Sequence, residues 1–468
     1  MKLKKLAVLS MAALMAAGLT ACGGSGSGET TAAAGGETKT EAAGESSAAE
    51  TTGAAAEAGD GKVYFLNFKP ESAEIWEEVV EVFTEETGIP ATVMTAASNT
   101  YEQTLKSEIA KTEAPTLFQI NGPVGYQAWK DYCMDLKDTS FYEALSDKSL
   151  AITDGEGVYG IPYAIEGYGI IYNDKIIRDY CALEGAKITS AEDIKSFETL
   201  KAVAEDIQAK KDELGIEGAF ASTSFAPGED WRWQTHLANM PLAYEYQDKG
   251  VTDADAIEGT YLENFKAVFD LYINNSCTEP GMLSSKTVAD SMAEFALGEV
   301  AFAQNGNWAW GDIQDNEVAA EDVKYLPIYI GVDGEEKQGL CIGTENYWCV
   351  NSQASEADQQ ATLQFVDWLL NSETGKDYMV NKLEFTAPFS TFGESEAPSN
   401  PLSKAIVEAT NSGTQSVNWA FNTMPSQTYK NKLGAALLEY AQGTGDWAAV
   451  ETAFVDNWAA EKANPTAE

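Results

Sequence analysis

Two short segments of the sequence place tryptophan side chains among polar and turn residues. The first, Pro-Gly-Glu-Asp-Trp-Arg-Trp, ends at Trp233, and the second, Asn-Gly-Asn-Trp-Ala-Trp, ends at Trp310. Core tryptophans usually lie in apolar surroundings, whereas the C–H face of a pyranose can pack on an indole ring. Carboxylates and amides beside such rings can hydrogen-bond the sugar hydroxyls. For any one ring, packing is about as plausible as ligand contact, but as a set beside polar partners the rings favour sugar binding.

Other motifs that could do chemistry are weak. Residues 155–160 fit the pattern GxGxxG, which in a dinucleotide site turns backbone N–H groups toward a pyrophosphate. The Ile-Pro-Tyr sequence that follows does not begin a helix, so we predict turn residues before a strand. The adjacent acids Glu229 and Asp230 could be glycosidase carboxylates, but with 73 acidic residues such neighbours are common. With no P-loop and no HExxH motif, nothing specific supports an enzyme.

The cysteines and the histidine give little basis for a metal site or a disulfide framework. The chain has six cysteines, no CxxC pair and one histidine, His236, so zinc would have few ligands. Cys341 and Cys349 could pair, and buried free thiols are equally plausible. We expect no metal and no cofactor.

The beginning of the chain has the pattern of an export and lipidation signal. Three lysines precede an apolar run over residues 6–19, which is shorter than the roughly 20 residues that a membrane-spanning helix needs. The sequence Leu-Thr-Ala-Cys that ends at Cys22 resembles the bacterial lipoprotein box, which implies a signal peptide over residues 1–21 and acylation, including palmitoylation, of Cys22. Residues 22–60 are almost entirely Gly, Ala, Ser, Thr and Glu and are predicted to form a disordered acidic tether.

Charge and length restrict the function and the fold of the remaining chain. The formal net charge of −43 for the whole chain disfavours a nucleic-acid partner, because phosphate neutralisation needs a basic face. Residues 61–468 exceed the size at which a single core usually stops growing, which indicates two lobes.

Apolar periodicity predicts strands that alternate with helices, typical of an α/β protein with parallel, doubly wound sheets. The predicted strands are residues 63–66, 91–95 and 116–120. The predicted helices are residues 75–83 with a stop at Gly88, 101–110, 194–207 with Ser190 and Asp193 as caps and an end near Gly215, 356–370 and 429–440.

Three segments carry a family resemblance. Residues 298–313, which contain Gly-Glu-Val-Ala-Phe-Ala-Gln-Asn-Gly-Asn-Trp, are similar to the pattern G-[EK]-x-A-M-x-x-x-G-x-W. Residues 160–173 are similar to a crossing between lobes that ends in Tyr-Asn, and residues 114–118 resemble A-P-D-[IL]-[FV] with Thr116 in place of the aspartate. The chain thereby resembles the extracellular solute-binding proteins, family 1, of carbohydrate ABC transporters, which include maltose-binding protein.

The resemblance implies a two-lobed, periplasmic-binding-protein-like fold of type II. Each lobe would be a doubly wound sheet with flanking helices, and hinge crossovers would join the lobes around a sugar-binding cleft. The crossovers are expected near residues 164–168, 339–345 and 394–400. The implied N-lobe is 61–165 plus 345–393, and the implied C-lobe is 166–344 plus 394–468.

The resemblance also suggests individual ligand contacts. Trp308 matches the family's sugar-stacking tryptophan, and Glu166 matches an acidic residue that bonds sugar hydroxyls. An acid-plus-aromatic group adds the candidates Glu229, Asp230, Trp231 and Trp233. Three more candidates lie just after predicted strands, namely Asn67, Glu71 and Asn121. The remaining candidates are Tyr163, Asn305, Trp348 and Trp419. Gly122 and Pro123 stand where maltose-binding protein has an Asp-Arg pair, so the resemblance does not extend to maltose specificity.

We therefore expect a monomeric, lipid-anchored receptor on the outer face of the cytoplasmic membrane that binds a sugar and no nucleic acid. Its expected partners are the permease subunits and the cytosolic ATPase of an ABC importer, and it would contact the membrane only through its anchor. An extracellular glycoside hydrolase, a surface interaction lipoprotein and a receptor for a non-sugar solute stay open as alternatives.

Overall fold

The computed structural model describes residues 61–97, 100–393 and 396–463, which belong to one compact unit, residues 57–468. The predicted signal peptide, Cys22 and the tether lie outside the described residues. Within the described part, the strands form two sheets of six strands each, and no helix has the length and apolar character to span a membrane.

The first sheet has the strand order β2-β1-β3-β11-β5-β4. Its strands are β1 (Val63–Asn67), β2 (Ala91–Thr95), β3 (Leu117–Asn121), β4 (Ile152–Asp154), β5 (Gly157–Pro162) and β11 (Asn346–Val350). Strand β1 is parallel to β2 and β3, whereas β11 is antiparallel to β3 and β5. The sheet is therefore mixed. One reason is the tight turn at Gly155, with φ of 58°, because a two-residue turn can join only antiparallel strands such as β4 and β5.

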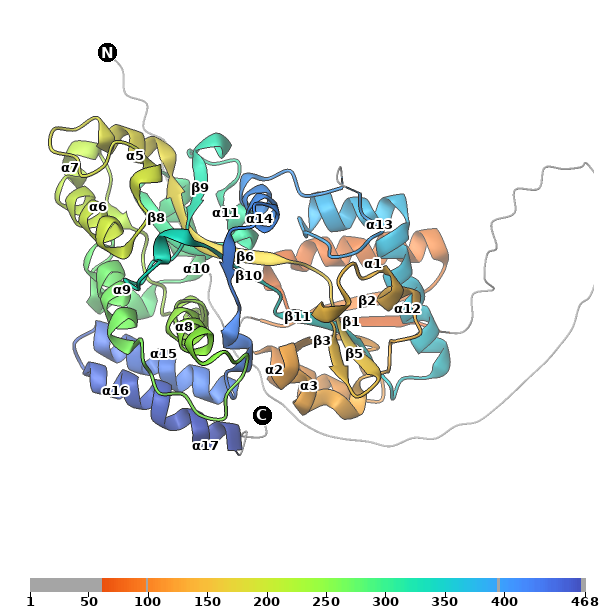
Figure 1. The fold of residues 1–468 in the computed structure, drawn as a ribbon. Helices are drawn as coiled ribbons and strands as arrows, with labels where there is room; N and C mark the ends of the chain where they lie inside the picture. Colours follow the sequence, from red (N-terminus) through yellow and green to blue (C-terminus); the bar gives the residue numbers. More distant parts are fainter. Residues whose placement is uncertain (1–60, 98–99, 394–395, 464–468) are drawn as a thin grey trace, which may run out of the picture. The chain divides into compact units, whose positions relative to one another are not determined.

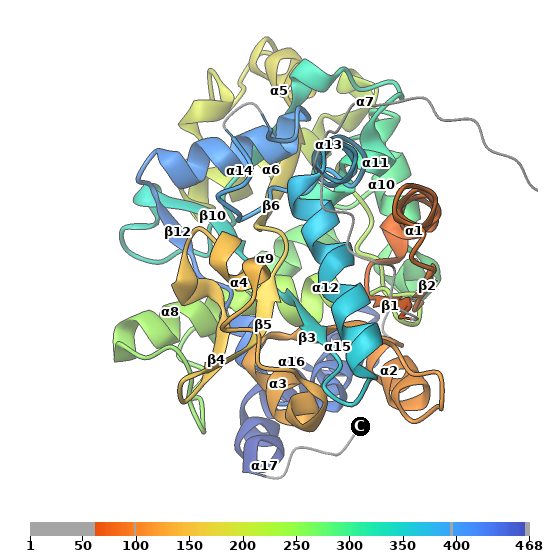
Figure 2. The same ribbon diagram turned by 90° about the vertical axis from the view of Figure 1, so that its right-hand side faces the viewer.

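Helices cover both faces of this sheet because its strand side chains are buried on both sides. Phe65 packs with Phe83 and Phe365 on one face, and its neighbour Leu66 packs with Leu105 on the other. The helices are α1 (Ala73–Thr87), α2 (Tyr101–Ile109), α3 (Gly122–Trp129), α4 (Ser140–Ala144), α12 (Glu356–Asn371) and α13 (Glu373–Asp377). We call the first sheet and these helices the first lobe; Figure 2 turns it toward the viewer.

The second sheet has the order β12-β10-β6-β8-β7, with β9 also paired to β6. Its strands are β6 (Glu166–Asn173), β7 (Gly218–Phe220), β8 (Val300–Gly306), β9 (Val323–Leu326), β10 (Gln338–Gly343) and β12 (Gln415–Val417). Every residue of β6 and β8 is buried, so these two strands form the centre of the sheet.

The second sheet and its helices form what we call the second lobe. The helices are α5 (Asp174–Cys181), α6 (Phe197–Ala209), α7 (Lys211–Leu214), α8 (Asn239–Lys249), α9 (Leu262–Asn274), α10 (Val288–Ala296), α11 (Trp310–Ile313), α14 (Pro401–Asn411), α15 (Gln427–Ala441), α16 (Trp447–Glu451) and α17 (Asn457–Ala463). A short π-helical segment, η5 (Arg232–Leu237), precedes α8.

Short connections carry the chain between the two sheets (Figure 1). Residues 163–165 lead from β5 to β6, and residues 344–345 lead back from β10 to β11. After α13 the chain returns to the second lobe, where α14 packs on β6, β9 and β10.

Several local predictions are confirmed and one needs correction. Gly88 ends α1 in the left-handed conformation, at φ 75°, as expected of a helix C-cap, and Gly155 lies in a turn before a strand. The predicted cap at Ser190 is wrong for the long helix, because Ser190 and Asp193 form a capping box on a single 3-10 turn and Ser196 caps α6. Of the two alternatives left open for Cys341 and Cys349, the buried free thiols are the one observed, and the two residues do not pair.

The reason is topological, because Cys341 lies in β10 of the second sheet and Cys349 in β11 of the first. Both are buried free thiols, and the other described cysteines are free as well.

Candidate ligand-binding site

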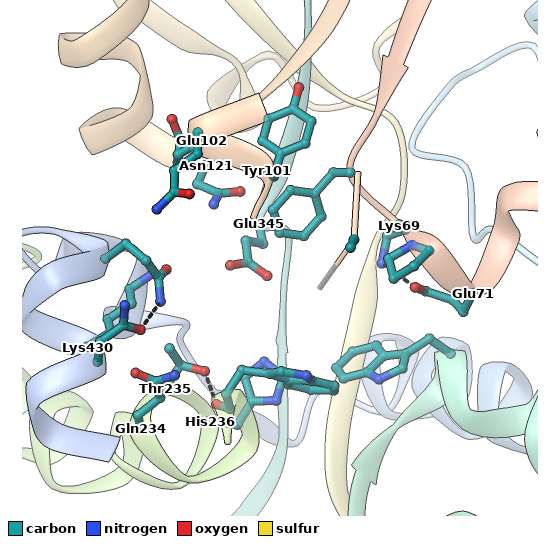
Figure 3. A pocket seen from close by; sticks show the side chains of 18 of the residues that line it. Lys69, Glu71, Tyr101, Glu102, Asn121, Gln234, Thr235, His236, Glu345 and Lys430 are labelled. Carbon is teal, nitrogen blue, oxygen red and sulfur yellow. Dashed lines mark hydrogen bonds and ion pairs between the residues drawn. The ribbon is translucent and has the colours of Figure 1, made fainter. Parts of the chain in front are cut away.

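A cavity of about 490 Å³ lies between the two lobes, within the range of about 300–1,000 Å³ typical of small-molecule sites. The first lobe lines it with the loop after β1, the beginning of α2 and the end of β3. The second lobe contributes η5, the turn after β8, Trp419 and the beginning of α15. Two glutamates at the connections between the sheets, Glu166 and Glu345, complete the lining; Figure 3 shows Glu345. The strand ends of the first lobe are the carboxyl ends of parallel strands, where ligands collect in α/β sheets.

Aromatic rings from both lobes face this cavity. In the second lobe the rings of Trp231 and Trp308 lie 6.1 Å apart, and His236 lies 5.3 Å from Trp308 and 6.2 Å from Trp419. In the first lobe Tyr101 lines the cavity together with Phe68, whose ring centroid is 5.1 Å away. Such rings offer flat apolar surfaces on both sides of a bound molecule.

Two glycines fix the positions of the tryptophan rings. A Cβ on Gly306 would lie 2.2 Å from the Trp308 ring, and a Cβ on Gly343 would lie 2.7 Å from the Trp419 ring. Each indole therefore rests directly on backbone, which only glycine permits at that distance.

A buried ion pair joins the two lobes at the floor of the cavity. The Nζ of Lys69, in the loop after β1, lies 2.7 Å from Oε1 of Glu166 at the beginning of β6, and both side chains are less than a tenth exposed. Burial alone would lower the pKa of Lys69, but the charges of Glu166 and Glu71 and the hydrogen bond to Glu166 together outweigh burial, and the pKa is raised. The same ammonium lies 5.6 Å from the Trp308 ring centroid and 3.5 Å from Glu71. Each of the two buried charges is compensated by the other, so the loss of either side chain would leave an uncompensated charge in the site.

Glu345 is the second acid at a connection between the sheets, and its carboxylate points into the cavity (Figure 3). Its backbone oxygen accepts a hydrogen bond from Gly122, which fixes the main chain. Burial raises the pKa of this carboxyl, Lys430 and Lys69 lower it, and Glu166 and Glu71 raise it further. The raised pKa means that the surroundings destabilise the ionised carboxylate of Glu345. Hydrogen bonds donated by a ligand would stabilise this ionised form.

His236 contributes a neutral ring to the cavity wall. Burial lowers its pKa well below the usual value, and the nearby charges of Arg232, Lys430 and Lys69 lower it further. Its ring stacks on Tyr168 at 4.3 Å. An uncharged imidazole in this position acts as an aromatic surface and a hydrogen-bonding group, not as a cation.

Six of the thirteen residues proposed from the sequence line this cavity. They are Trp308, Glu166, Trp231, Glu71, Asn121 and Trp419. Among the described residues no cluster of His, Cys, Asp and Glu suits a metal ion.

The other seven residues do not line the cavity, and three of them are buried core aromatics. Trp233 belongs to the core of the second lobe and Trp348 to that of the first. Tyr163 stacks on Trp348 at 4.7 Å and accepts a hydrogen bond from Gln119.

The four polar residues of this group are close to the cavity in sequence but make their contacts within the protein. The amide of Asn67 donates to the backbone oxygen of Lys69 at 2.8 Å, which shapes the loop after β1. Asn305 is buried in β8 next to Gly306. Glu229 accepts from the backbone N–H of Val288.

Asp230 supports the cavity wall from behind. It accepts a 2.9 Å hydrogen bond from Gln234 of η5, and burial raises its pKa to about 6. Its carboxylate lies against α15, since a Cβ on Gly434 would be 1.9 Å from Oδ2.

Several cavity residues had no sequence signal that singled them out. Phe68 and Lys69 come directly after Asn67, the last residue of β1, and the strand-end argument stopped one residue short of them. Tyr101, Glu345 and Lys430 enter the cavity only because three distant segments meet there.

Comparison with protein families identifies one match. A sequence profile for bacterial extracellular solute-binding proteins matches residues 78–402. No curated protein sequence matches the chain significantly.

Solved structures share the fold at low sequence identity. A chitin oligosaccharide binding protein is 20% identical with a TM-score of 0.67, covering 87% of this chain and 100% of its own. The solute-binding protein RafE in complex with raffinose is 16% identical with a TM-score of 0.65, covering 86% and 99%. The acarbose-binding GacH receptor of Streptomyces glaucescens GLA.O is 16% identical with a TM-score of 0.64, also covering 86% and 99%. The two-lobed fold predicted from the sequence is confirmed.

Proposed function

Because the chain belongs to the bacterial extracellular solute-binding proteins, we propose that its cavity captures a sugar, and specifically an oligosaccharide, outside the cytoplasm. The observation that carries this proposal is the cavity between the lobes, with aromatic rings on both sides and carboxylates and amides at its polar edge. The titles of the similar structures name chitin oligosaccharide, raffinose and acarbose as ligands of those proteins.

The proposed contacts divide by chemistry. Trp308, Trp231 and Trp419 stack on the apolar faces of sugar rings. Glu166 and Glu345 accept hydrogen bonds from hydroxyls, since an ionised carboxylate is an acceptor only. The first lobe adds the carboxylate of Glu71 and the amide of Asn121, and the second lobe adds the ammonium of Lys430.

The proposed mechanism is closure of the two lobes around the sugar, without a chemical step. The connections at residues 163–165 and 344–345 and the return to α14 are the proposed hinge segments, and hinge closure around a ligand is an established mode of motion. We propose lobe boundaries at 61–165 plus 345–393 and 166–344 plus 394–468. The closed form would dock on ABC permeases driven by a cytosolic ATPase, with the receptor, a monomer, held nearby by lipidated Cys22 and the tether.

A glycan array followed by calorimetry on purified residues 61–468 tests the proposal. We expect binding of at least one oligosaccharide, a shift of tryptophan fluorescence and a raised melting temperature. Trp308→Ala should weaken binding at least about tenfold, because stacking on an indole contributes about 1.5 kcal/mol or more, and should leave the fold intact by circular dichroism. Unchanged affinity in this variant would contradict the stacking role.

The same preparation distinguishes the alternatives. Hydrolysis of a bound oligosaccharide would indicate a glycoside hydrolase. Failure on the whole panel, with tight binding to a surface protein, would indicate an interaction lipoprotein, and binding of a charged non-sugar solute would change the ligand class within the family.

A further inference from the structure

A second, much smaller cavity lies inside the second lobe. Its volume is about 10 Å³, and its lining includes Thr223 after β7, Arg232 of η5, Tyr272 of α9 and Gln304 of β8. None of the residues that line it also lines the ligand cavity.

Four polar atoms of this lining have no hydrogen-bond partner. They are Oγ1 of Thr223, Nε of Arg232, the hydroxyl of Tyr272 and Oε1 of Gln304. The four residues are between 1% and 4% exposed, so bulk water does not reach them. Buried polar groups are nearly always hydrogen-bonded, and four exceptions around one small cavity indicate a shared partner.

Arg232 connects this cavity to the ligand cavity. Its guanidinium carbon lies 5.4 Å from the ring centroid of Trp231, a ring of the ligand cavity, and 5.7 Å from that of Trp233. One terminal nitrogen donates to the hydroxyl of Ser224, and the backbone oxygen of Arg232 accepts from Nε2 of Gln304 at 3.0 Å. Whatever binds Nε therefore also determines how the guanidinium lies on Trp231.

The size and polarity of the cavity fit one water molecule. About 10–15 Å³ is enough for one water, which needs two to four polar partners. A water can accept from Nε of Arg232 and donate to Oε1 of Gln304, because an amide oxygen is an acceptor only. The hydrogen bond from Nε2 to the backbone oxygen of Arg232 fixes this orientation of the amide. An anion such as chloride would face that acceptor, and Glu229, Asp312 and Glu294 already surround the guanidinium with negative charge.

We propose that this cavity is a binding site for one water molecule, which completes the hydrogen bonds of Arg232 and so holds the Trp231 ring in the wall of the ligand cavity. Arg232 is then a positioning residue. Its effect on sugar affinity rests on the proposed function, but the water site itself does not.

The sign of a stability change tests the site without any ligand. Tyr272→Phe should lower the melting temperature by about 1 °C, and adding Thr223→Val should lower it further, because each removes a partner of the water. In a dry cavity the hydroxyl of Tyr272 would only be a buried group without a partner, and Tyr272→Phe would raise the melting temperature. Tyr325→Phe is the matched control, since its hydroxyl is also buried without a partner but lies outside both cavities; it should raise the melting temperature.

Crystals grown in sodium bromide identify the occupant. Electron density in the small cavity without an anomalous bromide peak supports a bound water. An anomalous peak in this cavity, or the absence of density there, overturns the proposal.

A double-mutant cycle on sugar affinity tests the positioning role. Tyr272→Phe should weaken binding about two- to fivefold in the wild-type background and have no effect beside Trp231→Ala. An equal loss in both backgrounds would refute action through Trp231. If no sugar binds at all, the proposed function fails while the melting temperatures and the crystals still decide on the water site.

Discussion

Replacing Glu345 by glutamine should make the unliganded protein more stable and the sugar complex weaker. Burial raises the pKa of this carboxyl, which means that the folded protein binds its proton more tightly than the unfolded chain. The contribution of Glu345 to stability is therefore fully present below the unfolded value of 4.5 and is lost as the pH rises through the raised folded pKa. At pH 7 Glu345→Gln removes a half-buried charge and should raise the melting temperature of the free protein.

The affinity should change in the opposite direction. Hydrogen bonds to an ionised carboxylate are about twice as strong as neutral ones, so the amide should cost about 1–2 kcal/mol of binding free energy, or about 5- to 30-fold in Kd. Wild-type affinity should fall as the pH is lowered through the raised pKa of Glu345, since protonation removes an acceptor of the sugar hydroxyls. Affinity of the variant should change little over that range.

Calorimetry across pH and differential scanning calorimetry of the free protein measure both effects. Glu384→Gln is the matched control, because burial also raises the pKa of Glu384 but the residue does not line the cavity. The control should raise the melting temperature and leave affinity unchanged. The reasoning fails if Glu345→Gln binds as tightly as the wild type with the same pH profile.

Three further changes probe the site and its supports. Gly306→Ala should weaken sugar binding at least about tenfold, as strongly as loss of ring stacking, because its Cβ would lie 2.2 Å from the Trp308 ring, whereas Gly311→Ala, with nothing within 4 Å, should leave calorimetric affinity unchanged. Asp230→Asn should stabilise the free protein by about 3 kcal/mol at pH 7, since its pKa is raised from 3.8 to about 6; the gain should vanish in denaturant titrations below pH 3.8, and a constant gain would exclude this cause. Glu166→Gln should cost about 2 kcal/mol of unfolding free energy, because the buried lysine loses its nearest carboxylate, and unchanged stability would show that the pair contributes nothing.

Local sequence patterns were enough to predict the elements that carry their own signals. Gly88 could be recognised as a helix end because a left-handed C-cap needs glycine. The strands β1 and β2 are short β-prone runs, and their residues are those predicted to within one position. The capping prediction at Ser190 was wrong because a capping box forms equally well on a 3-10 turn. The capping residues alone do not show how long the helix after them is.

The ligand cavity shows where this local information stops. Trp308 and Trp231 could be singled out because indoles beside glycine and acidic residues are unusual in a core. The same argument selected Trp233, which belongs to the core of the second lobe. Whether an aromatic ring faces ligand or core depends on which side of its element meets the neighbouring helix.

The sequence by itself was enough to predict an α/β protein from apolar periodicity, and its resemblance to a known family predicted two lobes and aromatic residues at the site. Only the tertiary structure decided which charges share the cavity. Lys69 and Glu166 are 97 positions apart, and Glu345 and Lys430 come from a connection between the sheets and a helix near the end of the chain. Their proximity results from the packing of whole elements, which no local pattern records.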